Sequence, residues 1–483
     1  MSMQEKIAQA FELLEQQVFV LEKDPQIGNA VIGKLNALGP ELRIWVDTAN
    51  AFGHHATTMN ILKRMVQYGF SKPIRVFCDA SNAAKLQLFL PGYTAGDKDL
   101  QYQGVQLIFH YDEDTPPSTA APLLLCGGSE AKEDELKTRL DKANCQYYLQ
   151  LQPWNWKSLD RLIYKPTAQD PAKSVTLNGQ QLLGGPAFSF CAFNEPAPKR
   201  DDTIWDAYAR LYANRVAIAK ILSDAIIANP NQYHVLPEYG LGTKSSAFAA
   251  LLTLMLGTLQ AQILMPQRGL TSRPVLLVVF DVFDNAEWKE LQAWLDGSST
   301  DEDYPDQLKD YVTQNGIAAR CIFSVSDDPS KVQQDLAGLN GNKVMAVKMS
   351  SCPDEIFRYF YASATLPYAF EGRGTQNLAL NLRLPYMCTG PEGYPSFFLN
   401  NQTPPPAAAA ERLTGTIREG AFRYKKPSAE FPSTRFAGLL CDLLKDQVAM
   451  TYFEVLSSVY GSGNNDKLRM ALRFLRSIKG FPA

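Results

Sequence analysis

Short apolar runs alternate with segments of helical periodicity along most of this chain, and this alternation restricts the fold more than any other feature. Residues 42–46, 73–79 and 122–126 are apolar runs of strand length in the first half, and 275–280 and 343–347 are their counterparts in the second. Apolar strands separated by helices are typical of parallel sheets that helices cover on both faces. We therefore expect an α/β fold.

The length of the chain indicates more than one domain. A single core stops growing near roughly 250–300 residues, whereas this chain has 483 residues, of which 46% are hydrophobic. We expect two Rossmann-like domains facing a central cleft, over 1–230 and 231–430, with an extra N-terminal helix at 3–22. Within the second domain we expect 390–430 to be irregular, and residues 431–483 to form C-terminal helices.

Composition argues against several classes of protein. The net charge is −3 and the basic residues are scattered, so a nucleic-acid partner is not expected. The acidic N-terminus does not resemble a signal peptide, and the apolar stretch 247–259 is too short for a membrane span. The eight cysteines form no CxxC motif and lie mostly in apolar surroundings. We expect a cytoplasmic protein, with export without a cleaved signal as the open alternative.

The first candidate loop follows the strand at 42–46. Asp47 lies at the carboxyl end of that strand, where α/β folds place functional groups. Asp47 or His54 could act as a general base for an acceptor nucleophile. Asn50, Gly53 and His55 are candidate substrate contacts in the same loop. The alternative is a capped turn with polar residues at the start of a helix.

The second candidate loop opens the helix predicted at 244–260. Gly240 and Gly242 allow close backbone approach, and Thr243 and Lys244 stand at the start of the helix with Tyr239 before them. A glycine-rich helix start of this kind suits a phosphate group. The spacing is not that of a P-loop, and an ordinary capped helix start is the alternative.

The third candidate loop joins a strand to the helix predicted at 374–382. The acidic residue at the end of the strand could accept hydrogen bonds from ribose hydroxyls, and the arginine could balance phosphate charge. The amides at the helix start could hold a diphosphate. The alternative is a tight turn with an exposed Glu–Arg pair. The candidate contacts are Glu371, Arg373, Gly374, Thr375, Gln376 and Asn377.

Two acidic triplets match the DxD motif of metal-dependent glycosyltransferases, but the residues around them indicate a structural role. Asp112-Glu113-Asp114 precedes two prolines and is interpreted as a solvated turn, and Asp301-Glu302-Asp303 as a helix start. The metal-binding motif HExxH and the dinucleotide motif GxGxxG do not occur in the sequence. We therefore expect neither a metal nor a cofactor.

The third loop resembles the nucleotide-binding segment of GT-B glycosyltransferases. The match runs from Gly374-Thr375 to Leu384-Pro385, with Arg383 where a glycine is usual. The first loop is similar to that of the protein-arginine rhamnosyltransferase branch, which reads like VDNFGDIG. Asp47 matches its first aspartate and Phe52-Gly53 its Phe-Gly, whereas His54 stands in place of its second aspartate.

The resemblance implies a glycosyltransferase that needs no metal. The nucleotide-sugar donor would bind the C-terminal domain, and the acceptor, a protein or a small molecule, would bind the N-terminal domain. In many members a final helix crosses back to the first domain, and the helices after 431 suit that arrangement. A nucleotide-sugar epimerase and a non-catalytic nucleotide-binding or interaction protein on the same fold are the alternatives.

Overall fold

A computed structural model describes the chain in two compact units. The N-terminal unit comprises the described residues of Leu14–Pro196, Gln376–Asn381 and Ser458–Ala483, and the C-terminal unit those of Ala197–Thr375 and Leu382–Ser457. The helix predicted at 3–22 lies outside the described residues. The described residues are 32–33, 35–37, 39–47, 52–128, 133–153, 161–164, 173–174, 176–177, 180–181, 193, 198–241, 244–390, 405–424, 430–460 and 466–476.

The N-terminal unit contains a mixed eight-stranded sheet in the order β3-β4-β2-β1-β5-β6-β7-β8. The strands from β4 to β6 in this order run parallel, and β3, β7 and β8 extend the edges in antiparallel pairing. The strands are β1 (Leu42–Trp45), β2 (Ile74–Phe77), β3 (Asp99–Tyr102), β4 (Val105–His110), β5 (Ala121–Gly127), β6 (Cys145–Leu151), β7 (Arg161–Tyr164) and β8 (Lys173–Ser174). A separate pair joins β9 (Thr176–Leu177) and β10 (Gln180–Gln181).

Besides the helical residues 32–33 and 35–37, the helices of this unit are α3 (Phe52–Gln67), α4 (Ala83–Leu86), α5 (Glu133–Lys142) and α17 (Lys467–Arg476). The last of them comes from the C-terminal end of the chain. Leu468 and Leu472 of α17 are buried in the same core as Ile44 of β1. The buried Lys467 ammonium donates to the carbonyl of Gln152 at 2.9 Å. These contacts attach α17 to the N-terminal sheet.

The C-terminal unit contains a six-stranded sheet in the order β13-β14-β12-β11-β15-β16, and every pair in it is parallel. Its strands are β11 (His234–Tyr239), β12 (Val275–Val279), β13 (Cys321–Ser324), β14 (Val344–Lys348), β15 (Tyr368–Phe370) and β16 (Tyr386–Cys388). Its helices are α7 (Asp202–Ala228), α8 (Lys244–Gln267), α9 (Asn285–Asp296), α10 (Asp306–Gln314), α11 (Pro329–Ala337), α12 (Asp354–Ala362), α14 (Ala408–Arg423), α15 (Pro432–Lys445) and α16 (Gln447–Tyr460). The short α13 (Arg373–Ala379) begins in this unit.

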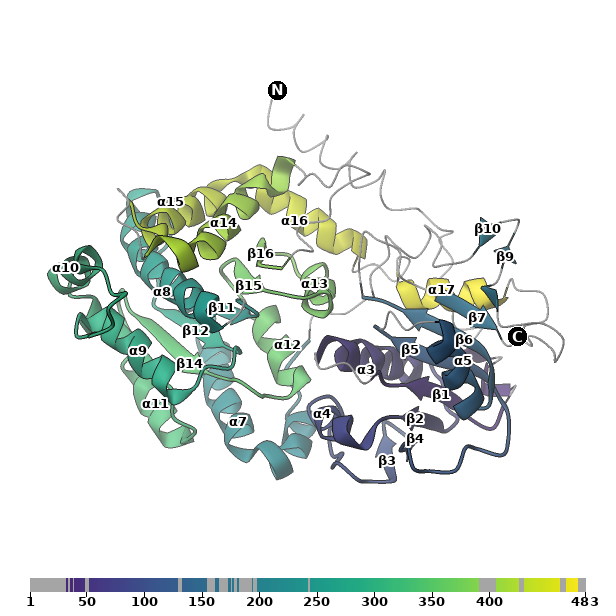
Figure 1. Ribbon diagram of the computed structural model, residues 1–483. Helices are drawn as coiled ribbons and strands as arrows, with labels where there is room; N and C mark the ends of the chain where they lie inside the picture. Colours follow the sequence, from purple (N-terminus) through teal and green to yellow (C-terminus); the bar gives the residue numbers. More distant parts are fainter. Residues whose placement is uncertain are drawn as a thin grey trace. The chain divides into compact units, whose positions relative to one another are not determined.

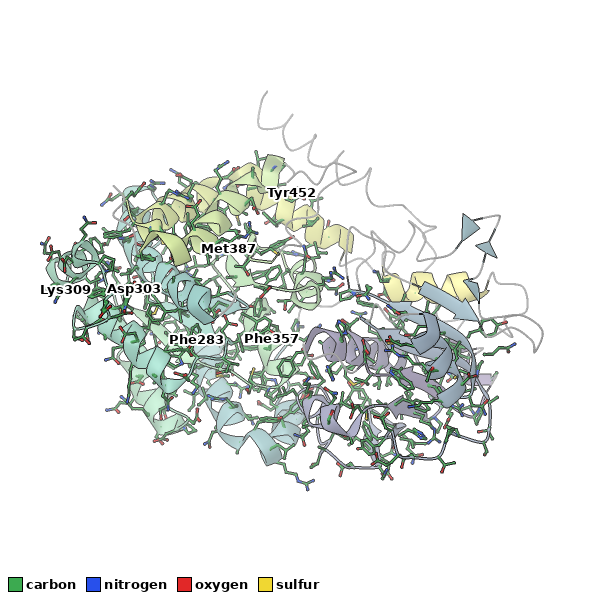
Figure 2. All side chains as sticks on the ribbon, in the orientation of Figure 1. Phe283, Asp303, Lys309, Phe357, Met387 and Tyr452 are labelled. Atoms are coloured by element: carbon green, nitrogen blue, oxygen red, sulfur yellow. The ribbon has the colours of Figure 1, made fainter. Side chains whose placement is uncertain are left out.

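Helices cover the C-terminal sheet on both faces. Figure 1 shows α8, α14 and α15 on one side of the strands and α7, α11 and α12 on the other. All five side chains of β12 are buried, which explains why this strand is apolar at every position. Side chains fill the space between the layers (Figure 2). The structure therefore shows the expected α/β architecture, with a Rossmann-like sheet in each unit.

Two expected features differ from the structure. Residues 408–423, which we expected to be irregular, form α14, because Ala410, Leu413 and Ile417 recur at helical spacing and are buried. The first candidate loop is also shorter than expected: the sequence pattern predicts a helix from about Thr57, whereas α3 begins at Phe52. His54 and His55 therefore lie in the first turn of a helix.

The central helix α8 is longer than the apolar stretch suggested. Among the described residues, one segment, Ala247–Gln267, is long and apolar enough to cross a membrane, and 78% of its most apolar window is buried inside the protein. The side chain of Phe436 in α15 packs against Gly257, where an added Cβ would come within 2.5 Å of the ring. This glycine sets how closely α8 and α15 approach.

Two identical substitutions test this packing. Gly257→Ala should lower the free energy of unfolding by about 1–3 kcal/mol, because the methyl group overpacks the contact with Phe436. Gly415→Ala in α14 is the control, since its Cβ would meet no atom within 4 Å. That change should instead stabilise its helix by about 0.8–1 kcal/mol. Thermal unfolding of the two variants would measure both effects, and equal melting temperatures would contradict the packing described.

Candidate functional site

Polar residues gather at the carboxyl end of β1 in the N-terminal unit. β1 pairs with β2 on one side and with β5 on the other, so the direction of the strand order reverses between β1 and β5. Ligands of open α/β sheets bind at the carboxyl ends of the strands beside such a reversal. Asp47 follows β1 at this point, and Gly127 and Gly128 stand at the end of β5.

The two glycines allow the first turn of α3 to lie against the end of β5. A Cβ on Gly127 would come within 2.5 Å of the amide nitrogen of Thr58, and Gly128 has a φ of +89°. A Cβ on Gly128 would come within 3.1 Å of the Cα atom of His54. Our sequence reasoning missed this pair, although Gly-Gly directly after an apolar strand is a signal of close backbone approach.

The carboxylate of Asp47 is held by two partners. Its Oδ1 atom accepts from Arg139 at 2.9 Å, and its Oδ2 atom lies 3.1 Å from Nδ1 of His54. The Asp47 side chain is only 11% exposed. Both carboxylate oxygens are therefore engaged within the protein, which makes Asp47 poorly placed to take a proton from a substrate directly.

Arg139 is a further residue that sequence reasoning missed. It comes from α5, stacks over the ring of Trp45 at 5.6 Å, and donates to the hydroxyl of Tyr148 at 3.3 Å. Its side chain is 10% exposed, so its pairing with Asp47 is shielded from solvent. We infer that Arg139 keeps Asp47 ionised and oriented. Nothing in the local sequence of α5 distinguishes this arginine from a surface residue.

His54 is the member of this group that a ligand can reach, because its side chain is 34% exposed. An ionised carboxylate only accepts hydrogen bonds, so the proton between His54 and Asp47 is on Nδ1. The lone pair on Nε2 is then available to accept a proton from a substrate. The geometry favours His54 as the base and Asp47 as the residue that orients it.

The other predicted contacts of the first loop lie in different surroundings. His55 is wholly buried, which removes it from the candidate ligand contacts. Gly53 lies in open space, since an added Cβ would meet no protein atom within 4 Å. Asn50 lies outside the described residues. The candidate site of this unit therefore consists of His54, Asp47 and Arg139.

A second polar group lies at the carboxyl edge of the C-terminal sheet. The strand order there reverses between β11 and β15. The loops after these two strands touch: Gly240, with a φ of +72°, would place a Cβ 2.4 Å from the Cβ atom of Glu371. The amide of Glu371 donates to the carbonyl of Tyr239 at 3.0 Å. The second and third candidate loops therefore form one site.

Asp281, at the end of β12, occupies the amides of the second loop. Its carboxylate accepts from the backbone amides of Gly240 at 2.7 Å and Leu241 at 2.9 Å. A phosphate would compete with this carboxylate for the two amides, and the carboxylate would repel an anion at that position. Carboxylates instead accept hydrogen bonds from hydroxyl groups. This part of the loop therefore suits the hydroxyls of a ribose or sugar better than the predicted phosphate.

The carboxyl group of Glu238 lies beneath this loop and is wholly buried. Burial and the neighbouring Asp281 carboxylate raise the pKa of Glu238 well above its ordinary 4.5. Burial beside a second carboxyl group therefore favours the protonated form of Glu238. We call Glu238, Asp281 and Glu371 the carboxyl cluster.

Tyr239 lies between the members of the carboxyl cluster. Burial raises the pKa of its hydroxyl, and the charges of Asp281 and Glu371 raise it further. Its ring meets Phe357 of α12 edge-on at 5.7 Å, and Phe357 also packs on Phe280. This aromatic packing supports the loop from below and keeps Tyr239 neutral.

The remaining predicted contacts surround α13 and the start of α8. Arg373 is the first residue of α13, and Gly374 and Thr375 follow it, all three of intermediate exposure. Gln376 is wholly buried. The buried Asn377 amide binds the backbone of Phe193, which it accepts from at 2.8 Å and donates to at 3.1 Å.

Gln376 and Asn377 therefore support the N-terminal unit, to which they belong, rather than present their side chains to a ligand. Gly242 and Thr243 lie outside the described residues, and Lys244 is the first residue of α8.

The acidic triplets have structural partners. Asp114 pairs with Lys98 at 2.9 Å and accepts from the amide of Tyr111 at 2.9 Å. Asp301 accepts from the amide of Asp303 at 2.9 Å. In the part of the chain that the structure describes, no three histidine, cysteine or acidic side chains are grouped in a way that could hold a metal ion.

The sequence matches no protein-family model and no curated protein sequence.

The buried carboxyl group predicts a pH dependence of stability. The pKa of Glu238 is raised in the folded protein, so its contribution is fully present below its ordinary pKa of 4.5 and is lost as the pH rises toward the folded value. Glu238→Gln keeps a neutral side chain at every pH. The free energy of unfolding of Glu238→Gln relative to the wild type should therefore increase from about pH 5 to pH 8, by at most about 1.4 kcal/mol per pH unit. Melting temperatures recorded across this range would show the same trend.

The exposed Glu302→Gln in the same unit is the control and should give a difference that does not change with pH. If the melting temperatures of Glu238→Gln and the wild type differed by the same amount at every pH in this range, a raised pKa of Glu238 would be contradicted.

Proposed function

We propose that this protein transfers a glycosyl group from a nucleotide sugar to an acceptor. The observation that carries the proposal is the pair of polar groups at the two strand-order reversals. One has a histidine base oriented by a buried aspartate, and the other has carboxylates suited to sugar hydroxyls. Two Rossmann-like units in one chain, with these groups, support a GT-B glycosyltransferase with the donor on the C-terminal unit and the acceptor on the N-terminal unit.

On the donor side, Glu371 and Asp281 would accept hydrogen bonds from ribose or sugar hydroxyls. Arg373, two residues after Glu371, would balance the charge of the diphosphate, and Lys244 would add to it. α13 has only seven residues, so the arginine matters more here than the helix dipole. Cation side chains in these roles make the proposed reaction independent of a metal.

On the acceptor side, Nε2 of His54 would take the proton of an acceptor hydroxyl as its oxygen attacks the anomeric carbon. The bond from that carbon to the diphosphate oxygen breaks, and the diphosphate leaves with the electron pair. Asp47 would stabilise the imidazolium that forms, as paired carboxylates do in other histidine bases. A single displacement of this kind inverts the configuration at the anomeric carbon.

We place the protein in the cytoplasm as part of the same proposal. Its described cysteines are free thiols, and most of them are buried. Burial raises the pKa of Cys126 to about 11, so this thiol resists oxidation and ionisation. Reduced, buried cysteines are typical of proteins from reducing compartments.

Binding of nucleotides tests the donor side. UDP, GDP, dTDP and CMP would each be titrated into the wild type and Glu371→Gln while the melting temperature is recorded. One nucleotide should stabilise the wild type, by about 2.7 kcal/mol at a hundredfold excess over Kd. Glu371→Gln should lose most of this stabilisation, because the uncharged amide is a weaker acceptor for ribose hydroxyls.

Glu302→Gln is the matched control, since it removes one exposed carboxylate from the same unit, and it should bind as the wild type does. The absence of any shift in a wild-type protein that unfolds cooperatively would refute the donor site and favour a non-catalytic interaction protein.

A further inference from the structure

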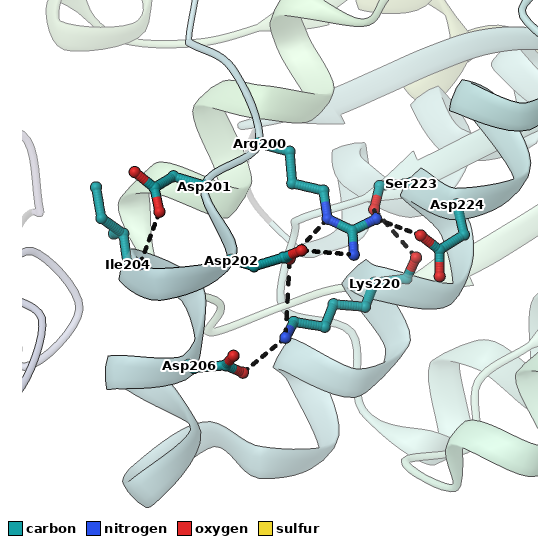
Figure 3. Close-up of polar contacts among 8 residues, drawn as sticks. All are labelled: Arg200, Asp201, Asp202, Ile204, Asp206, Lys220, Ser223 and Asp224. Atoms are coloured by element: carbon teal, nitrogen blue, oxygen red, sulfur yellow. Dashed lines mark hydrogen bonds and ion pairs between the residues drawn. The ribbon is translucent and has the colours of Figure 1, made fainter.

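A sharp bend interrupts α7 in the C-terminal unit. Tyr212 has a φ of −128° and a ψ of 38°, which are not helical values. In a straight helix, Asp206 and Lys220 would be separated by about 21 Å along the axis. Their side chains instead form an ion pair at 2.6 Å, so the two segments of α7 fold toward each other (Figure 3).

A network of charged side chains holds this bend in place. Arg200 precedes the helix and pairs with Asp202 in the first segment and with Asp224 in the second (Figure 3). Its guanidinium also donates to the buried hydroxyl of Ser223 at 2.7 Å. The network connects both segments through one arginine, which indicates that the bend is a permanent part of the fold.

The bend forms one wall of a cleft, which we call the α7 cleft. The other walls are the segments that follow β12 and β14, so the cleft lies at the carboxyl edge of the sheet, where α/β folds bind ligands. Its volume is about 530 Å³, within the roughly 300–1,000 Å³ of small-molecule sites. Asp281 of the carboxyl cluster directly precedes Val282 of this cleft, but none of the carboxyl cluster lines it.

The charged side chains of the cleft leave an excess of positive charge. Arg215 pairs with Asp327 at 2.7 Å and donates to the carbonyl of Lys348 at 2.9 Å. No carboxylate in the described part of the chain pairs with the ammonium of Lys348. Two cations and one carboxylate give the cleft a net charge of +1. An anion would complete this arrangement.

The cleft also presents apolar surface that the fold leaves uncovered. Val282 is 73% exposed and Leu211 is 42% exposed, and both belong to the few large apolar side chains that are exposed among the described residues. Phe283, the next residue along the chain, also lines the cleft. Apolar side chains grouped in a cleft beside a cation are typical of a ligand site.

Two serines complete the polar part of the cleft. Ser350 is 5% exposed, and its hydroxyl has no hydrogen-bond partner among the described residues. Ser351 has a φ of +58°, a strained value for a residue other than glycine. An unsatisfied buried hydroxyl and local strain at one loop often mark a functional position.

We propose that the α7 cleft binds a small organic anion, with an apolar body against Val282 and Leu211 and one carboxylate or phosphate group at Lys348. The proposal does not depend on glycosyl transfer, because its residues are separate from the carboxyl cluster and from His54.

Binding of three simple probes tests the proposal. Benzoate and phenyl phosphate combine an apolar ring with either anionic group, and benzyl alcohol is the neutral analogue. Dissociation constants would be measured by ligand-observed NMR on the full-length protein. Lys348→Ala should weaken binding of the anions about tenfold or more, which is the value of one charge-assisted contact, and leave benzyl alcohol unchanged. Val282→Ser should weaken all three probes.

Lys309→Ala removes an exposed lysine of α10 from the same unit and should have no effect (Figure 2). Glu371→Gln should also leave probe binding unchanged, which separates this site from the proposed donor site. The anion that binds with the lower dissociation constant identifies the ligand as a carboxylate or a phosphate. Equal affinities of Lys348→Ala and the wild type, loss of binding in Glu371→Gln, or no binding of any probe at millimolar concentration would each overturn the proposal.

Discussion

Parallel strand pairing under a double cover of helices determines where chemistry can occur in this protein. β12 is buried at all five positions, between β11 and β14, and β11 is buried over most of its length. Neither face of such a sheet can hold an exposed polar group, so polar side chains occur where the strands end. His54, Asp47, the carboxyl cluster and Lys348 all stand at or after the carboxyl end of a strand.

Charge pairing then decides what each strand end can do. Arg139 holds Asp47, which leaves the exposed ring of His54 as the proton acceptor in the proposed reaction. The Asp281 carboxylate accepts from two backbone amides of the glycine loop, which is why the proposed ligand groups at this loop are hydroxyls and not a phosphate. In both places a buried or half-buried carboxylate changes the role of the groups around it.

The strand–helix alternation predicted most of the fold. A buried parallel strand is a continuous apolar run, which can be recognised from its own sequence without knowledge of the strands beside it. The candidate loops were located by the same rule. Long-range pairing could not be predicted: Arg139 and Asp47 are separated by 92 residues. The sequence of α7 contains no proline or glycine that would predict the bend at Tyr212. The bend depends on ion pairs between residues in separate turns of the helix.

Turnover of a nucleotide sugar tests the central claim most directly. The wild type and His54→Gln would be incubated with UDP-, GDP-, dTDP- and CMP-sugars, with water as the surrogate acceptor, and the released nucleotide would be quantified. The proposed function predicts slow release from one donor class, and a rate lower by about 10²–10⁴ in His54→Gln, the range for loss of a general base. Equal release by both proteins, or release from no donor, would contradict it.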